Sequence, residues 1–189
     1  MNTELKPTYR ILGIDPGTNI LGFGLLEIEN KTMRLIDLGV VNLKKEEEQP
    51  EKLKRIFERL QEIIVQYQPR EMAIETPFYG KNVQSMFKLG RAQGVAIAAA
   101  ITKGLTVTEY SAKKIKQAVT GNGNASKEQV AAMLGTILKT DLNEQYLDAT
   151  DALATAVCHY YQSTSRVGSS TKGKGWSGFL KDNPDRVSK

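Results

Sequence analysis

A hydrophobic run that ends in an acidic residue at a sharp turn constrains the fold of this chain more than any other feature. The run Ile11–Ile14 leads into Asp15, and a second hydrophobic run covers Ile20–Ile28. Between them lies Pro16-Gly17, which predicts a type II turn with the glycine at positive φ. The pattern therefore predicts a β-hairpin that presents the Asp15 carboxylate at the end of its first strand.

The rest of the chain alternates between strand and helix periodicity. Hydrophobic residues recur every three or four positions from Pro50 onward, which predicts an amphipathic helix that ends before Pro69. Further strands are predicted over Met33–Leu43, Met72–Glu75 and Leu105–Tyr110, and further helices over Val83–Lys103, from Ser111, over Ser126–Leu138 and over Asp148–Gln162. This order predicts an α/β fold with a mixed five-stranded sheet, in which an antiparallel meander of three strands joins two parallel strands and helices cover both faces.

Length and composition exclude several classes of protein. The 189 residues suit one domain over residues 10–162, between a flexible lead over 1–9 and a basic, disordered tail over 163–189. No hydrophobic run could span a membrane and the first ten residues do not resemble a signal peptide, so we expect a cytoplasmic protein. The single cysteine, Cys158, excludes a disulfide framework. The single histidine, His159, argues against a histidine-rich metal site or a Ser-His-Asp triad, and we expect it to be a partly exposed helix residue.

Charge is distributed unevenly along the chain. Residues 81–140 carry nine basic and two acidic side chains, whereas residues 141–162 carry four acidic side chains and no lysine or arginine. A basic segment beside an acidic one suggests a polyanionic ligand held next to a metal site. The alternative is that the lysines only cover solvated helix faces.

Four carboxylates form the candidate catalytic and metal-binding set: Asp15, Glu75, Asp148 and Asp151. Asp15 and Glu75 each end a predicted strand, and Asp148 and Asp151 lie three residues apart near the start of a helix, so they point the same way. Taken singly, Asp15 could be an ordinary turn residue, and Asp148 and Asp151 could be acids favoured by the dipole at the start of a helix. Together they would repel one another unless divalent cations lie among them, and oxygen ligands select Mg²⁺ or Mn²⁺. Two such ions are the usual apparatus of phosphodiester hydrolysis.

Aromatic and basic residues near these acids predict contacts with DNA. Phe78 and Tyr79, in a predicted loop after Glu75, could stack on unpaired bases or fold back on the core. Lysines and arginines can bind phosphates without reading sequence. The candidate set is Phe78, Tyr79, Lys81, Lys88, Arg91, Lys113, Lys114, Lys116 and Lys127.

Four blocks resemble the RuvC family of bacterial Holliday-junction resolvases: IDPGTNILGFGL, AIETPFYGKN, KLGRAQGVAIAAA and DATDALATAVCHYY. The resemblance runs from about Arg10 to Gln162. It implies a ribonuclease H-like fold, a homodimer, two Mg²⁺ ions per subunit, paired nicks across a four-way DNA junction, and cooperation with a RuvA–RuvB branch-migration complex. It also implies that the four carboxylates are catalytic, that Phe78 stacks on a junction base, and that Lys116 and Lys127 contact the DNA backbone.

Three other interpretations stay open on the sequence. IDPGTN with Gly22 and Gly24 also resembles the first phosphate loop of actin-like ATPases and sugar kinases, although a second phosphate loop and a second domain are missing. A ribonuclease H-like nuclease that acts on ribosomal RNA precursors is closer, but that family is shorter. A non-enzymatic DNA-binding module would leave the carboxylates unexplained. Small residues at Gly90, Gly94 and Ala98 predict that a backbone, of the sheet or of a second subunit, packs closely there.

Overall fold

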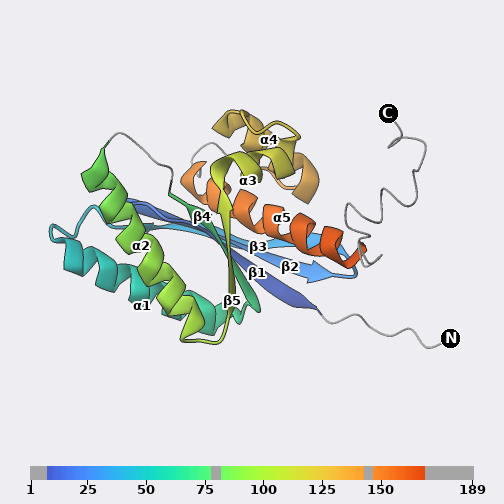
Figure 1. Cartoon of the computed structure of the whole chain (residues 1–189). Coiled ribbons are helices and arrows are strands. Elements are labelled where there is room, and N and C mark those ends of the chain that lie inside the picture. Colours follow the sequence, from blue (N-terminus) through green and yellow to red (C-terminus); the bar gives the residue numbers. More distant parts are fainter. Residues whose placement is uncertain (1–7, 78–81, 143–146, 169–189) are drawn as a thin grey trace, which may run out of the picture.

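The computed structural model describes residues 8–77, 82–142 and 147–168, with side chains up to residue 164 (Figure 1). Its elements follow in the order predicted from the sequence. They are β1 (Tyr9–Asp15), β2 (Ile20–Glu29), β3 (Thr32–Asn42), α1 (Gln49–Tyr67), β4 (Glu71–Thr76), α2 (Val83–Ile101), β5 (Thr106–Ser111), α3 (Ala112–Thr120), α4 (Lys127–Leu138) and α5 (Leu147–Gly168).

The strands form one mixed sheet in the order β3-β2-β1-β4-β5. The pairs β1–β2 and β2–β3 are antiparallel, and the pairs β1–β4 and β4–β5 are parallel. This confirms the predicted meander with two added parallel strands. Because β1, β4 and β5 run in the same direction, their carboxyl ends meet at one edge of the sheet.

Helices cover both faces of the sheet (Figure 1). Side chains alternate along each strand, so Leu12 and Ile14 of β1 face α1 and α2, whereas Ile11 faces α3, α4 and α5. Each face has its own hydrophobic core. In Figure 1, α5 crosses the sheet on the face opposite α1 and α2. Every second residue of β1, counted from Ile11, therefore points towards α5, and Asp15 is one of these residues. Glu75 points towards α5 from β4 in the same way.

Glycines let α5 approach the sheet closely. A Cβ atom added to Gly22 would lie 2.1 Å from the carbonyl oxygen of Asp148, and one added to Gly13 would lie 2.1 Å from that of Ala152. A Cβ added to Gly24 would lie 2.7 Å from the Cα of Leu153. Any side chain at these positions would push the first turns of α5 away from β1 and β2.

Among the predicted caps, turns and helix ends, one cap is confirmed, and one turn and one helix end are wrong. Ser126 and Gln129 form the predicted capping box of α4. Gly17 lies outside the positive-φ region, so the predicted type II turn is wrong. A Cβ at Gly17 would instead lie 1.9 Å from the carbonyl oxygen of Ile20, so this glycine is required by a close approach. The helix predicted to end at Gln162 continues to Gly168, into the stretch predicted to be tail. Within the described ranges, no helix is long and hydrophobic enough to cross a membrane.

Candidate active site

The carboxylates converge because two strands and one helix meet at the same edge of the sheet. The parallel register pairs Ile14 of β1 with Ile74 of β4, which brings the next residues, Asp15 and Glu75, to neighbouring strand ends. Adjacent strands lie about 4.8 Å apart. From the α5 side, Asp151 reaches the same point, since the helix is pressed onto Gly22 and Gly13.

A cavity of about 250 Å³ lies at this convergence. Asp15, Glu75 and Asp151 line it together with the ammonium-bearing side chains of Lys116 and Lys127. Its remaining described wall is hydrophobic, from α3, α4 and α5: Ala112, Ile115, Val130 and Ala154. Three of the four predicted carboxylates thus share one small, partly enclosed space.

Asp148 joins this group through Lys127. The Lys127 Nζ lies 2.5 Å from Asp151 Oδ2 and 3.7 Å from Asp148 Oδ1. The Asp148 side chain is 47% exposed and that of Asp151 only 16%, which places Asp148 at the rim and Asp151 inside. The four predicted carboxylates therefore lie close together, and the Lys127 ammonium pairs with two of them.

Burial and mutual repulsion raise the pKa of two of the carboxylates. Burial, then the negative charges of Glu75 and Asp151, raise the pKa of Asp15 to about 8. Burial, followed by the charge of Asp151, raises the pKa of Glu75 to about 7, against the opposing effect of Lys127 and Lys116. Buried like charges that hold protons near neutral pH favour the binding of a cation that can replace those protons.

The donor set fits a hard divalent cation. Asp15, Glu75 and Asp151 offer only oxygen atoms, which Mg²⁺ and Mn²⁺ prefer. Among the residues described, however, no group of three or more His, Cys, Asp or Glu side chains is arranged to hold an ion. Mg²⁺ is usually bound by one or two carboxylates, and water and substrate phosphates complete its coordination sphere.

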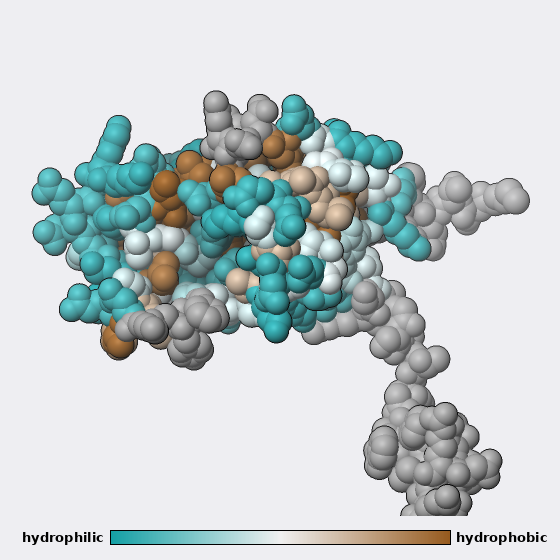
Figure 2. Space-filling model, turned by 90° about the horizontal axis from the view of Figure 1, so that it is seen from above, coloured by the Kyte–Doolittle hydropathy of each residue, from teal (hydrophilic) through white to brown (hydrophobic). Residues whose placement is uncertain are grey.

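A larger cavity of about 860 Å³ adjoins the first and shares Ala112 and Lys116 with it. It extends between α2 and α3 over the carboxyl ends of β4 and β5, and Lys113 also lines it. Figure 2 looks down on α3 and α4 and shows hydrophilic residues interleaved with smaller hydrophobic patches.

The other predicted DNA contacts are in different surroundings. Lys88 and Arg91 line a separate hollow on α2 with Phe87, whose side chain is 65% exposed. Lys114 lines neither cavity, and its Nζ lies 5.3 Å from the centre of the Tyr110 ring. The remaining predicted contacts lie outside the described residues: Phe78, Tyr79 and Lys81.

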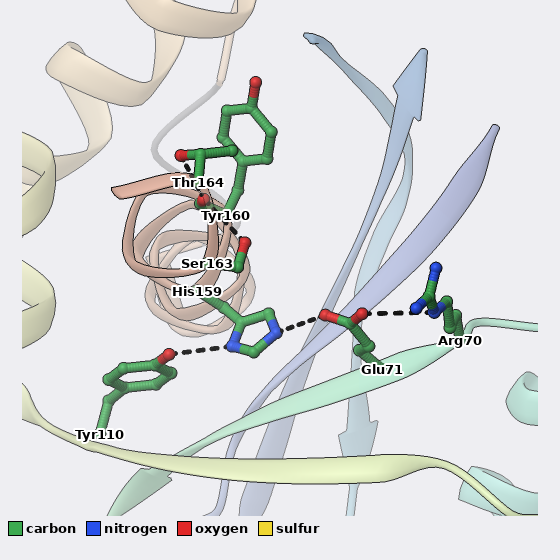
Figure 3. Close-up of polar contacts among 7 residues, drawn as sticks. All are labelled: Arg70, Glu71, Tyr110, His159, Tyr160, Ser163 and Thr164. Atoms are coloured by element: carbon green, nitrogen blue, oxygen red, sulfur yellow. Dashed lines mark hydrogen bonds and ion pairs between the residues drawn. The ribbon is translucent and has the colours of Figure 1, made fainter. Parts of the chain in front are cut away.

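His159 is not the partly exposed residue that the sequence predicts. It is buried, with its Nδ1 2.9 Å from the Tyr110 hydroxyl and its Nε2 2.7 Å from Glu71 Oε2 (Figure 3). Glu71 begins β4, whereas Glu75 lies near its end, so this chain of hydrogen bonds is about 13 Å along the strand from the carboxylate cavity. His159 thus links α5 to β4 and β5 without reaching the carboxylate cavity.

Comparison with known proteins identifies the family. The family model of crossover junction endodeoxyribonuclease RuvC matches residues 11–159. The chain belongs to the RuvC family. A crossover junction endodeoxyribonuclease RuvC from Cytophaga hutchinsonii is 58% identical over 178 residues, which cover 94% of this chain and 87% of the relative.

Solved RuvC structures share the fold. The Thermus thermophilus RuvC structure has a TM-score of 0.74 and 33% sequence identity, covering 82% of this chain and 96% of that one. A structure described as T. thermophilus RuvC in complex with Holliday junction substrate has a TM-score of 0.73 and 30% identity over the same shares. The predicted ribonuclease H-like fold and the predicted resemblance are confirmed. Membership of this family removes the ATPase and ribosomal RNA interpretations.

Sequence reasoning missed the glycines that position the site. Gly22 and Gly24 were notable only as a possible phosphate loop, yet their role is to admit the backbone of α5. Gly13, Gly22 and Gly24 all lie on the face of the sheet that packs against α5. Several glycines on the same face of two paired strands are therefore the signal that could have revealed this close packing.

Proposed function

We propose that this chain resolves Holliday junctions, by metal-dependent hydrolysis of one phosphodiester bond in each of two opposed strands, during recombination and DNA repair in the bacterial cytoplasm. The observation that carries the proposal is the cavity in which Asp15, Glu75 and Asp151 meet beside Lys116 and Lys127. Family membership and the junction-bound relative support the choice of substrate.

Asp15, Glu75, Asp148 and Asp151 would hold two Mg²⁺ ions per subunit, for which Mn²⁺ would substitute. Bound there, such ions activate a water molecule and stabilise the leaving oxygen of the phosphodiester. The protein residues have separate tasks. Asp15 and Glu75 would hold the cations from the rigid sheet, and Asp151 and Asp148 would hold them from α5.

DNA would approach across the larger cavity. Lys116 lies where the two cavities join, so its ammonium can bind the phosphate next to the scissile bond. Lys113 would contact the strand further along, and Lys88 and Arg91 would bind a neighbouring arm of the junction. Phe78 and Tyr79 would stack on bases freed at the crossover, with Lys81 beside them. We also propose that the enzyme acts as a homodimer and works with a RuvA–RuvB complex.

The decisive experiment compares three substrates: a synthetic four-way junction, a linear duplex of the same sequence and an RNA hairpin, each with Mg²⁺ and with EDTA. We expect paired nicks in the junction alone, and only with the metal. Asp15→Asn should bind the junction as the wild type does but cut it at least about a hundredfold more slowly, because a charged ligand is lost while the shape is kept.

Asp141→Asn is the matched control, since it removes an exposed carboxylate outside the cavity and should leave cleavage unchanged. Wild-type cleavage by Asp15→Asn, or full activity in EDTA, would contradict the proposed mechanism. Equal cutting of duplex and junction would contradict the proposed substrate.

A further inference from the structure

Lys127 has an unusual position for a residue expected to contact DNA. Among the ion pairs of the described residues, it is the cation that pairs with members of the carboxylate set, Asp151 and Asp148. It is also the first residue of α4. The positive end of the helix dipole disfavours a lysine there, and nearby negative charges offset that effect. The carboxylates supply those charges.

The charges around Lys127 support this interpretation. Burial lowers the pKa of its ammonium, but the hydrogen bond to Asp151 and the charges of Asp151, Asp15 and Asp148 outweigh that effect and raise it. In return, the ammonium lowers the pKa of both Asp15 and Glu75. One lysine therefore interacts with every member of the cluster.

A lysine in this position and a divalent cation need the same oxygen atoms. The ammonium is 2.5 Å from Asp151 Oδ2, and Mg²⁺ would bind that carboxylate at about 2.0–2.1 Å. An ammonium and a divalent ion on the same carboxylate oxygen would repel each other strongly, and the ammonium would add nothing to the coordination of the ion. Lys127 can leave, because its side chain is 50% exposed and lysine has a flexible four-carbon stem.

We propose that Lys127 is the counter-ion of the metal-free active site, and that it competes with divalent ions for Asp151 and Asp148 and moves off them when the ions bind. This rests on the proposed function, since it regulates the same site. A released ammonium next to the cavity is free to bind a DNA phosphate. Substrate and metal therefore assist each other's binding, because DNA offers Lys127 another anion.

The first test measures Mn²⁺ binding to the DNA-free protein, by following free Mn²⁺ in its electron paramagnetic resonance signal. Lys127→Met keeps the length of the side chain and removes the competing charge, so it should bind Mn²⁺ about fivefold more tightly than the wild type. Lys113→Met makes the same change of net charge on α3 and should stay within about twofold. Equal or weaker binding by Lys127→Met would overturn the proposal.

A third variant separates this proposal from the proposed function. Asp15→Asn should weaken Mn²⁺ binding strongly. If Asp15→Asn binds Mn²⁺ as the wild type does, the metal-binding assignment itself is wrong. If Asp15→Asn weakens binding but Lys127→Met does not tighten it, the metal site stands and only the counter-ion role of Lys127 fails.

A second test uses the wild-type chain and does not depend on the folding of any variant. An amine-specific reagent is applied with and without Mg²⁺, and labelling of each lysine is read by peptide mass spectrometry. Release from the carboxylates should speed the labelling of Lys127 about threefold or more, with Lys113 as internal reference. If the labelling rate of Lys127 is unchanged when the protein is saturated with Mg²⁺, the proposal is wrong.

Discussion

Lys114 and Lys116 are two residues apart, yet only one of them lies at the candidate site. Lys116 lines both cavities, whereas Lys114 lies over the Tyr110 ring. Lys116→Ala should therefore weaken binding to every DNA tested and reduce the log–log salt slope by about one unit. Lys114→Ala is the matched control and should leave the slope unchanged. Equal losses of slope, measured by fluorescence anisotropy over a salt series, would contradict the assignment.

The protonation of Asp15 and Glu75 predicts a dependence of stability on pH. Their folded-state pKa values of about 8 and about 7 lie above those of the unfolded chain. The stabilisation from the protonated forms is therefore complete below the unfolded-state pKa values of about 4, and it is lost progressively as pH rises to the folded-state values of about 7 and about 8. In EDTA, the melting temperature should fall between pH 5 and pH 9, and Asp15→Asn should flatten that fall. A wild-type melting temperature that stays level over this range, or equal slopes for both proteins, would contradict the assigned charge repulsion.

At the level of elements, the docking of α5 decides whether the site forms. Gly22→Ala would place a methyl group against the carbonyl oxygen of Asp148 and shift the helix. We expect a loss of stability of about 1–3 kcal/mol by urea denaturation and, in the folded variant, a loss of cleavage of about a hundredfold. Gly39→Ala is the control, since its Cβ would meet the Phe23 ring at 2.9 Å on the opposite face and should cost stability without comparable loss of cleavage. Equal losses of cleavage in both variants would contradict this account.

His159 links three elements and is predicted to act on stability alone. A ring protonated on Nε2 donates to Glu71 and accepts from the Tyr110 hydroxyl. His159→Phe would remove both hydrogen bonds, at a cost of about 1–3 kcal/mol. His159→Gln should recover part of that loss. Cleavage at a temperature where the variants stay folded should be normal, and a catalytic defect in a folded His159→Phe protein would refute this separation.

Element types and caps could be predicted because they depend on neighbouring residues. Pro50, Ser126 and Gln129 act within one helical turn, so periodicity and capping rules suffice. The role of Gly17, the burial of His159 and the different surroundings of Lys114 and Lys116 depend on how distant elements dock, and nothing local records that. Of the site, the four acids were predictable as strand ends and an i, i+3 pair. The ammonium of Lys127 among them was not, because it belongs to a separate helix.

At the scale of the whole molecule, paired cuts require two active sites related by a two-fold axis. The open face of α2 is the candidate interface, since Cβ atoms added at Gly90 and Gly94 would meet nothing within 4 Å, and Val83, Phe87 and Ile101 are exposed. Gly94→Leu should thus leave the subunit as stable as the wild type and weaken dimerisation at least about tenfold. Sedimentation velocity measures the association.

A plasmid with an extruded cruciform gives the functional readout. Two coordinated nicks linearise it, whereas separate nicks leave nicked circles, so Gly94→Leu should shift the product from linear to nicked DNA. A wild-type protein that sediments as a monomer at working concentration and still linearises the plasmid would rule out the dimer.

The contact between α5 and the glycines of β1 and β2 has a consequence for judging relatives of this chain. The acids supply the chemistry, but the distance between the acids on the strands and those on α5 is set by contact between the backbone of α5 and the backbones of β1 and β2. A copy of the gene could keep all four carboxylates and lose its activity through one added methyl group at the position of Gly22. A survey for inactive copies should therefore examine the glycines before the acids, because an intact set of ligands does not establish that they meet.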